Sequence, residues 1–180
     1  MSLRPWQVDA RHKINEISKK ESHTLIAVNA CVGSGKTTVA MQAMRDFIES
    51  HPNELTLQVF VCPRLALCDQ QINEIDNYMS GLSRVCTILW NCEGEKPKEL
   101  YDYNQHTILV ACDKSIWDGK LPKKLLESRV CGVIAYDESH NYFSHVQQMY
   151  GYKDEENVKP TNDEGYSKYF QINLFMSGTP

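Results

Sequence analysis

The segment from Ala30 to Thr37 has the residue types and spacing of a loop that binds phosphate groups. It runs Ala-Cys-Val-Gly-Ser-Gly-Lys-Thr, follows an apolar run and precedes a stretch with helical periodicity, which is the setting that such a loop requires. Glycines let the backbone wrap closely around phosphate oxygens, and the amide groups at the start of a helix face the anion. The lysine reaches the β- and γ-phosphates of a nucleoside triphosphate, and the next hydroxyl ligates Mg²⁺. We therefore predict Lys36 as a catalytic residue and Thr37 as a magnesium ligand.

The predicted ATP-binding part of this loop comprises Val32, Gly33, Ser34, Gly35, Lys36, Thr37 and Thr38. Ala30 stands where the general pattern opens with a glycine. The alternative is an ordinary tight turn between a strand and a helix. The sequence Gly-x-Gly-Lys-Thr after an apolar strand favours the phosphate loop instead.

Two carboxylates, Asp137 and Glu138, directly follow the apolar run from Val133 to Tyr136. Alone, such a pair is more often the solvated end of a strand. Together with the phosphate loop, the pair predicts Asp137 as a ligand of Mg²⁺, directly or through water. It also predicts Glu138 as the catalytic base that orients and deprotonates an attacking water. The implied chemistry is hydrolysis of the terminal phosphoanhydride bond of ATP.

Strands and helices alternate along the chain, so we predict an α/β fold with a mostly parallel sheet and helices on both faces. In such sheets, ligands bind beyond the carboxyl ends of the strands. Residues 91–105 and 151–165 are polar and are predicted to be loops. The predicted helices cover residues 5–19, 38–50, 65–79 and 121–127. The predicted strands cover residues 24–30, 55–62, 85–90, 107–112, 130–136 and 172–176.

Composition narrows the class of protein. The 180 residues are 42% hydrophobic, which suits one globular domain, and the net charge of -4 is mild evidence against strong non-specific binding of nucleic acid. The seven cysteines contain no C-x-x-C pair, so we predict buried free thiols in a reducing cytosol and not disulfides or a zinc site. No signal peptide or membrane span is predicted. We therefore expect a cytoplasmic protein, or a nuclear one in a eukaryote or a virus, and not a secreted one.

Taken in order, these segments resemble the first RecA-like motor domain of superfamily 2 helicases and translocases. The closest resemblance is to the DExH-type group of type III restriction-enzyme motor subunits and DNA repair helicases, and it covers the chain from Leu3 to Pro180. In this P-loop NTPase family, a glutamine ahead of the phosphate loop recognises adenine. The resemblance thereby implies that Gln7 reads the base and that Arg4 packs on it, which adds both to the ATP-binding residues.

Further motifs extend the resemblance. Asp137-Glu138-Ser139-His140 matches motif II, and Ser177-Gly178-Thr179 resembles motif III, which implies that His140, Ser177 and Thr179 couple the nucleotide state to a bound strand. The segment after Cys62 resembles motif Ia, which implies contacts from Pro63 and Arg64 to a nucleic-acid backbone. Taken singly, Gln7, Arg64 and Ser177 are ordinary helix-face, helix-start and turn residues. Their order along the chain is what supports the resemblance.

Two departures from the family pattern stand out. Cys112 occupies a position where the family usually has a threonine, and a thiol is a poor donor to a phosphate, so that contact is in doubt. Ser115, in the predicted loop that follows, is the replacement candidate. The 180 residues also form a single ATP-binding helicase domain without the second motor domain and its arginine finger. We therefore expect weak hydrolysis by this domain alone and predict that it is part of a longer helicase.

The resemblance implies an ATP-dependent hydrolase acting on acid anhydrides, with Mg²⁺ and ATP as cofactors and nucleic acid as its track. DNA is favoured over RNA because most of the close relatives act on DNA. One alternative is a P-loop ATPase or kinase that acts on a partner other than nucleic acid. A second is a nucleotide-sensing scaffold module without catalysis. The sequence predicts no membrane partner and gives no indication of oligomeric state.

Overall fold

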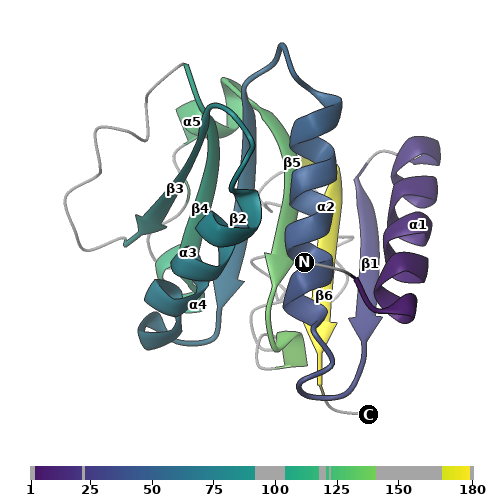
Figure 1. Ribbon diagram of the computed structural model, residues 1–180. Coiled ribbons are helices and arrows are strands. Elements are labelled where there is room, and N and C mark those ends of the chain that lie inside the picture. Colours follow the sequence, from purple (N-terminus) through teal and green to yellow (C-terminus); the bar gives the residue numbers. More distant parts are fainter. Residues whose placement is uncertain are drawn as a thin grey trace, which may run out of the picture.

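Six parallel strands form one sheet at the centre of the molecule (Figure 1). The computed structural model describes residues 3–21, 23–91, 104–117, 121, 123–140 and 168–178. The strands are β1 (Thr24–Asn29), β2 (Thr56–Cys62), β3 (Val85–Trp90), β4 (His106–Cys112), β5 (Val130–Tyr136) and β6 (Ile172–Ser177). The helices are α1 (Pro5–Lys20), α2 (Lys36–Ser50), α3 (Leu65–Met79), α4 (Asp113–Trp117) and α5 (Lys123–Glu127).

The order of the strands is β1-β6-β5-β2-β4-β3. Strand β6, from the far end of the described chain, therefore lies between β1 and β5. Because all six strands are parallel, the carboxyl ends of these three strands meet at one edge of the sheet. The segments that follow β1, β5 and β6 carry the phosphate loop, the acid pair and the Ser177 motif. The topology thus assembles three sites that are distant in sequence.

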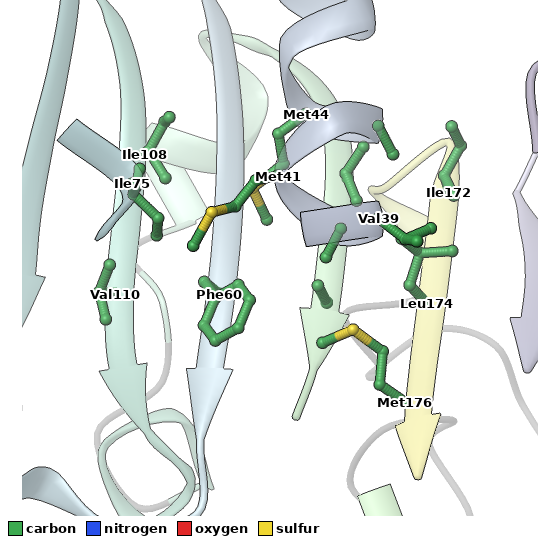
Figure 2. Packing of buried hydrophobic residues seen from close by; sticks show 14 of the residues in the cluster. Val39, Met41, Met44, Phe60, Ile75, Ile108, Val110, Ile172, Leu174 and Met176 are labelled. Carbon is green, nitrogen blue, oxygen red and sulfur yellow. The ribbon is translucent and has the colours of Figure 1, made fainter. Parts of the chain in front are cut away.

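Helices cover both faces of the sheet, as predicted. On one face, residues from α1, α2 and α3 pack on the sheet, and Figure 2 shows Met41 and Met44 of α2 close to Phe60 of β2. On the other face, Ile116 of α4 and Leu125 of α5 pack in a second apolar cluster. Strands β2 and β4 are buried along their whole length, which is why they are almost continuously apolar. Each fully buried large aliphatic side chain contributes about 1.5–3 kcal/mol, so these layers make the rigid support for the site.

Most predicted elements are confirmed, with shifts at their ends. The bounds of α3, β3 and β5 agree with prediction, whereas α2 begins at Lys36, two residues earlier than expected. The segment after Cys112, predicted as a loop, is instead the helix α4. Five residues are too few to show helical periodicity, which explains the error. Most of the two predicted polar loops, residues 92–103 and 151–165, lies outside the described residues.

Within the described part of the chain, none of the helices has the length and apolar character needed to cross a membrane.

Candidate nucleotide-binding site

The phosphate loop joins β1 to α2 and is closed by its own backbone. The amide of Ser34 donates to the carbonyl of Cys31 over 3.1 Å, and the amide of Ala30 donates to the carbonyl of Ser177 over 3.3 Å. The hydroxyl of Ser34 is buried and has no hydrogen-bond partner among the described residues. An unpaired buried hydroxyl costs free energy, so its place in this loop is consistent with a polar ligand here.

Gly35 is the residue at which the loop turns into α2. Its φ is 91°, in the left-handed region, where a side chain is strained. A Cβ atom at this position would also collide with the Nε2 atom of Gln7. Only glycine satisfies both the backbone and the neighbouring side chain.

Replacing Gly35 with alanine is expected to destabilise the protein by more than the roughly 1–2 kcal/mol of left-handed strain alone, because Gln7 must also move. The matched control is Gly81→Ala, since Gly81 has a φ of 94° but no atom within 4 Å of its virtual Cβ. Urea unfolding of both variants measures the difference. Equal losses in the two variants would show that the approach of Gln7 contributes nothing.

Lys36 lies at the first turn of α2 with its ammonium group folded over the loop. The residue is only 6% exposed, and its Nζ atom donates to the carbonyl oxygens of Ala30 at 3.1 Å and Cys31 at 3.4 Å. An ammonium group has three N–H donors, so one remains for an anion beside the loop. The side chain is thus already placed across the phosphate loop.

The acid pair follows β5 and is fixed to the sheet through its backbone. The amide of Asp137 donates to the carbonyl of Val61 over 2.9 Å. Glu138 has a φ of 48°, a left-handed conformation that costs about 1–3 kcal/mol outside glycine and that is typical of functional sites. This turn directs the Glu138 carboxylate towards β6, where its Oε2 atom accepts from the amide of Gly178 at 3.4 Å.

The side chains of Lys36 and Glu138 both lie beside Gly178. Its virtual Cβ position lies 3.1 Å from Lys36 Nζ and 3.5 Å from Glu138 Oε1. A side chain at residue 178 would therefore fill the space between the predicted phosphate-stabilising cation and the predicted base. The three strands β1, β5 and β6 deliver these groups to one place at the carboxyl edge of the sheet.

His140 links the acid pair to the end of β6. Its Nδ1 atom is 3.1 Å from the hydroxyl of Ser177 and 3.5 Å from Glu138 Oε2. The structure therefore brings together His140 and Ser177, which the sequence predicted as coupling residues. Thr179, the third predicted coupling residue, lies outside the described residues.

Asp137 is held in a setting that disfavours its charge. Burial raises the pKa of this carboxyl group, and the negative charge of Glu138 raises it further, whereas Lys36 acts in the opposite direction. A partly buried carboxylate beside a second carboxylate is a favourable place for a divalent cation. Among the described residues, no cluster of three or more His, Cys, Asp or Glu that could hold a metal occurs. Mg²⁺ needs only one or two carboxylates together with substrate phosphates.

The Asp137→Asn variant is expected to unfold at a higher temperature than the wild type at pH 7.5 without Mg²⁺ or nucleotide. The folded pKa of Asp137 lies above its unfolded value, so its ionised form costs folding free energy at neutral pH. That cost disappears as the pH falls through the raised folded pKa towards the unfolded pKa, and the two unfolding curves should then converge. Thermal scans across pH test this, and a lower midpoint for the variant at pH 7.5 would contradict it.

Arg4 and Gln7, at the start of α1, both contact the phosphate loop. Arg4 Nη1 donates to the carbonyl of Ser34 at 3.1 Å, and Gln7 Nε2 donates to the carbonyl of Gly35 at 3.0 Å. Gln7 Oε1 accepts from the amide of Arg4 at 2.7 Å, and the Gln7 residue is 4% exposed. The structure thus places Gln7 as a buried link between α1 and the phosphate loop, a contact that the sequence did not predict.

The residues predicted to contact nucleic acid differ in their exposure to solvent. Pro63 is half-buried, and Arg64 is exposed at the start of α3, beside the exposed side chains of Leu65 and Leu67. Ser115, in contrast, is 3% exposed, and its hydroxyl lies 3.1 Å from the sulfur of Cys112. The expectation that Ser115 stands on an open loop is therefore wrong, because helix α4 turns this residue into the protein.

The cysteines described are all free thiols: Cys31, Cys62, Cys68, Cys86, Cys112 and Cys131. Cys31 is exposed in the phosphate loop, whereas Cys62, Cys68, Cys112 and Cys131 are buried. Burial raises the pKa of Cys131 to about 12, so this thiol is unreactive at neutral pH. Cys92, the seventh, lies outside the described residues.

Comparison with known proteins agrees with the predicted fold. The family model described as "Type III restriction enzyme, res subunit" matches residues 1–180. No curated protein sequence matches the chain. Three solved structures resemble it at 14–16% identity, a level that shows the fold alone.

The first of these structures is a nuclease-deletion mutant of the Type ISP restriction-modification enzyme LlaGI in complex with a DNA substrate mimic. Its TM-score is 0.63 at 14% identity, and the match covers 100% of this chain and 18% of that chain. The UvsW helicase from bacteriophage T4 has a TM-score of 0.62 at 15% identity, over 99% of this chain and 53% of that chain. The Sulfolobus solfataricus SWI2/SNF2 ATPase core in complex with dsDNA has a TM-score of 0.60 at 16% identity. The match covers 100% of this chain and 32% of that chain. The chain thus spans about half or less of the length of each.

Proposed function

Because the chain belongs to the family of the type III restriction enzyme res subunit and has the RecA-like fold of superfamily 2 helicases, we propose that it is an ATP-binding motor domain. It hydrolyses MgATP and, together with a second motor domain, drives movement along nucleic acid. The observation that best supports this proposal is the meeting of Lys36 and Glu138 at Gly178. Hydrolysis of a γ-phosphate needs a cation to stabilise charge on the phosphate and a base to activate water. Lys36 and Glu138 are such a pair beside the phosphate loop.

The triphosphate lies along the loop from Val32 to Thr38, with its phosphate oxygens on the backbone amides and on the start of α2. The hydroxyl of Ser34, which has no partner among the described residues, points to a polar contact with this ligand. Lys36 donates its remaining N–H group to an oxygen of the β- or γ-phosphate. Thr37 and Asp137 would hold Mg²⁺, which would neutralise charge on the phosphate oxygens.

Hydrolysis then proceeds by attack of a water in line with the bond that breaks. Glu138 orients the water and accepts its proton while the water oxygen bonds to the γ-phosphorus atom. The bond from the γ-phosphorus to the β–γ bridging oxygen breaks, and ADP and inorganic phosphate are the products. Lys36 stabilises the charge that develops on the phosphate oxygens. In phosphoryl-transfer systems an added arginine stabilises the same charge and speeds turnover by about 10³ to 10⁵-fold.

Gln7 retains the groups needed to recognise adenine. The amide oxygen of a glutamine can accept twice and its nitrogen can donate twice. The oxygen of Gln7 accepts from the amide of Arg4, and its nitrogen donates to the carbonyls of Gly35 at 3.0 Å and Ser34 at 3.5 Å. The second acceptor of the oxygen matches the N6 amino group of adenine, and the N–H group of the long bond to Ser34 would turn to the N7 atom. Arg4 lies on the exposed side of the loop, where its guanidinium group can stack on the base.

DNA is the proposed track, with Pro63 and the exposed Arg64 as contacts to its backbone and His140, Ser177 and Thr179 as the coupling residues. Two of the similar structures are complexes with a DNA substrate mimic and with dsDNA, which supports DNA over RNA. His140 contacts both Glu138 and Ser177. A shift of β6 when nucleic acid binds would therefore move Glu138, the proposed catalytic base.

The test is ATP turnover by the full-length protein with single-stranded DNA, duplex DNA or single-stranded RNA, beside the His140→Ala variant. We expect DNA to stimulate turnover several-fold in the wild type, and the variant to keep its basal turnover but lose the stimulation. A matched control is His12→Ala, because His12 is exposed on α1. Turnover that ignores every polymer would instead favour a P-loop ATPase with another kind of partner.

A further inference from the structure

One carboxylate, Asp46, receives four hydrogen bonds from side chains of α1 and α2. Its Oδ2 atom accepts from Arg11 Nε at 2.7 Å and from Asn15 Nδ2 at 3.0 Å. Its Oδ1 atom accepts from Arg11 Nη2 at 2.7 Å and from Gln42 Nε2 at 2.6 Å. The Asp46 side chain is 11% exposed. Such a fully used, bidentate carboxylate is far more rigid than an ordinary surface ion pair.

The two partners of Asp46 on α1, Arg11 and Asn15, lie on the same face of that helix as Gln7. Residues 7, 11 and 15 are spaced by four, so their side chains follow one another along one side of the helix. Arg11 and Asn15 meet Asp46, and Gln7 meets Gly35. Asp46 and its partners Arg11, Asn15 and Gln42 form what we call the Asp46 cluster. This cluster lies one to two helical turns along α1 from Gln7, where α1 contacts the phosphate loop.

Apolar packing alone holds α1 only lightly. Gln7 and Ile14 are its only buried residues, with Trp6 and Ala10 partly buried against the core. Three of the hydrogen bonds to Asp46, two from Arg11 and one from Asn15, cross from α1 to α2. Because so little apolar surface fixes α1, these three bonds set its position and rotation. A small rotation about the axis of α1 would carry Gln7 away from the loop.

We propose that Asp46 is a positioning residue for base recognition, which fixes α1 so that Gln7 and Arg4 meet the adenine of the bound nucleotide. This proposal rests on the proposed function, because it assumes that ATP binds at the loop. Asp46 itself does not touch the nucleotide. It acts through the rotation of α1, so its loss affects recognition of the base and leaves recognition of the phosphates unchanged.

The cluster is extended to α3 through Gln42. The hydroxyl of Tyr78 donates to Gln42 Oε1 at 2.5 Å, and Arg45 Nη1 donates to the carbonyl of Tyr78 at 2.9 Å. Burial alone would raise the pKa of Asp46, but the hydrogen bonds from Arg11, Asn15 and Gln42 outweigh it, so this pKa lies below its ordinary value. Asp46 is therefore ionised at neutral pH and accepts from all its partners.

The variant Asp46→Asn tests the proposal because it keeps the shape of the side chain and replaces one acceptor by a donor. All four hydrogen bonds to Asp46 are donated by N–H groups of its three partners, Arg11, Asn15 and Gln42. The new amide therefore faces N–H groups and releases α1. The measurement is competition against a fluorescent nucleotide by MgATP and by magnesium tripolyphosphate, which has the phosphates without the base. We expect the Kd of ATP to rise about tenfold, as for the loss of one or two hydrogen bonds, and the Kd of tripolyphosphate to stay unchanged.

Glu16→Gln is the matched control, since Glu16 pairs with Lys20 on the exposed side of the same helix. It is expected to bind both ligands as the wild type does. Arg11→Ala should reproduce the effect of Asp46→Asn, and the double variant should be no worse than either single one. This non-additivity would not arise from two independent losses of stability.

The outcomes separate the proposal from the proposed function. If wild-type protein binds ATP more tightly than tripolyphosphate and Asp46→Asn leaves that ratio unchanged, the positioning role is wrong and the function stands. An equal loss of both ligands in the variant would show general damage and would also overturn the positioning role. If folded wild-type protein binds neither ligand, the proposed function itself fails.

Discussion

The Glu138→Gln variant is expected to lose about 10² to 10⁴-fold in ATP turnover and to bind ATP as tightly as the wild type. Glutamine keeps the size of the side chain and its acceptor towards Gly178, but it cannot take a proton from water. The loss should therefore appear in kcat and not in the Kd of ATP. Rapid-quench measurement of the chemical step, beside equilibrium binding, separates the two quantities.

A matched control for this variant is Glu54→Gln, since Glu54 is exposed in the turn before β2. It should turn over ATP at the wild-type rate. If Glu138→Gln kept near wild-type turnover, another group would have to be the base. The proposed mechanism of hydrolysis would then be wrong, although ATP binding at the loop would not be affected.

The Lys36→Ala variant is expected to lose both affinity for ATP and turnover, the latter by about 10² to 10³-fold, the usual cost of removing one charge-stabilising group. Lys36 is nearly buried and reaches the space beside Gly178, so no other described cation replaces it at that point. The free protein should remain folded, because alanine is accepted in the first turn of a helix. Equilibrium binding and steady-state kinetics measure both losses.

Lys124→Ala, a change at an exposed lysine of α5, is the control for the loss of one positive charge. It is expected to leave binding and turnover unchanged. Equal affinity of wild type and Lys36→Ala for ATP would mean that the nucleotide does not lie along this loop. That result would refute the central assignment, whereas loss of turnover alone would limit Lys36 to the chemical step.

The places of the phosphate loop after β1 and of the acid pair after β5 could be predicted from the sequence, because both are local patterns. Motifs such as Gly33 to Thr37 specify their structure within a few residues, through backbone conformation and the start of a helix. The bounds of β3 and β5, which are short apolar runs, and of α3, which shows helical spacing, were likewise predicted correctly.

Contacts between distant segments were not predictable in the same way. The placement of β6 between β1 and β5 depends on pairing between strands far apart in sequence, which periodicity does not encode. Asp46 meets Arg11 across 35 positions, and Gln7 meets Gly35 across 28. Each of these residues fits an ordinary helix face when taken alone, and only packing of α1 on α2 gives it a partner.

The prediction for Ser115 was wrong because a short helix was not recognised in the sequence. The segment after Cys112 was predicted as the loop that follows the fourth strand, with Ser115 as a possible contact to nucleic acid. The helix α4 instead buries the adjacent residues Ser115 and Ile116 and leaves Lys114 exposed. The length of α4 is below what a hydrophobic pattern can reveal.

The most direct test of the central claim is a calorimetric titration of MgATP into the folded 180-residue chain, with Lys36→Ala titrated in parallel. One ATP per chain should bind to the wild type, with affinity that falls when Mg²⁺ is removed, and binding to the variant should be lost or greatly weakened. Absence of binding to folded wild-type protein at millimolar ATP, or equal binding to both proteins, would contradict the assignment of a nucleotide site to this loop.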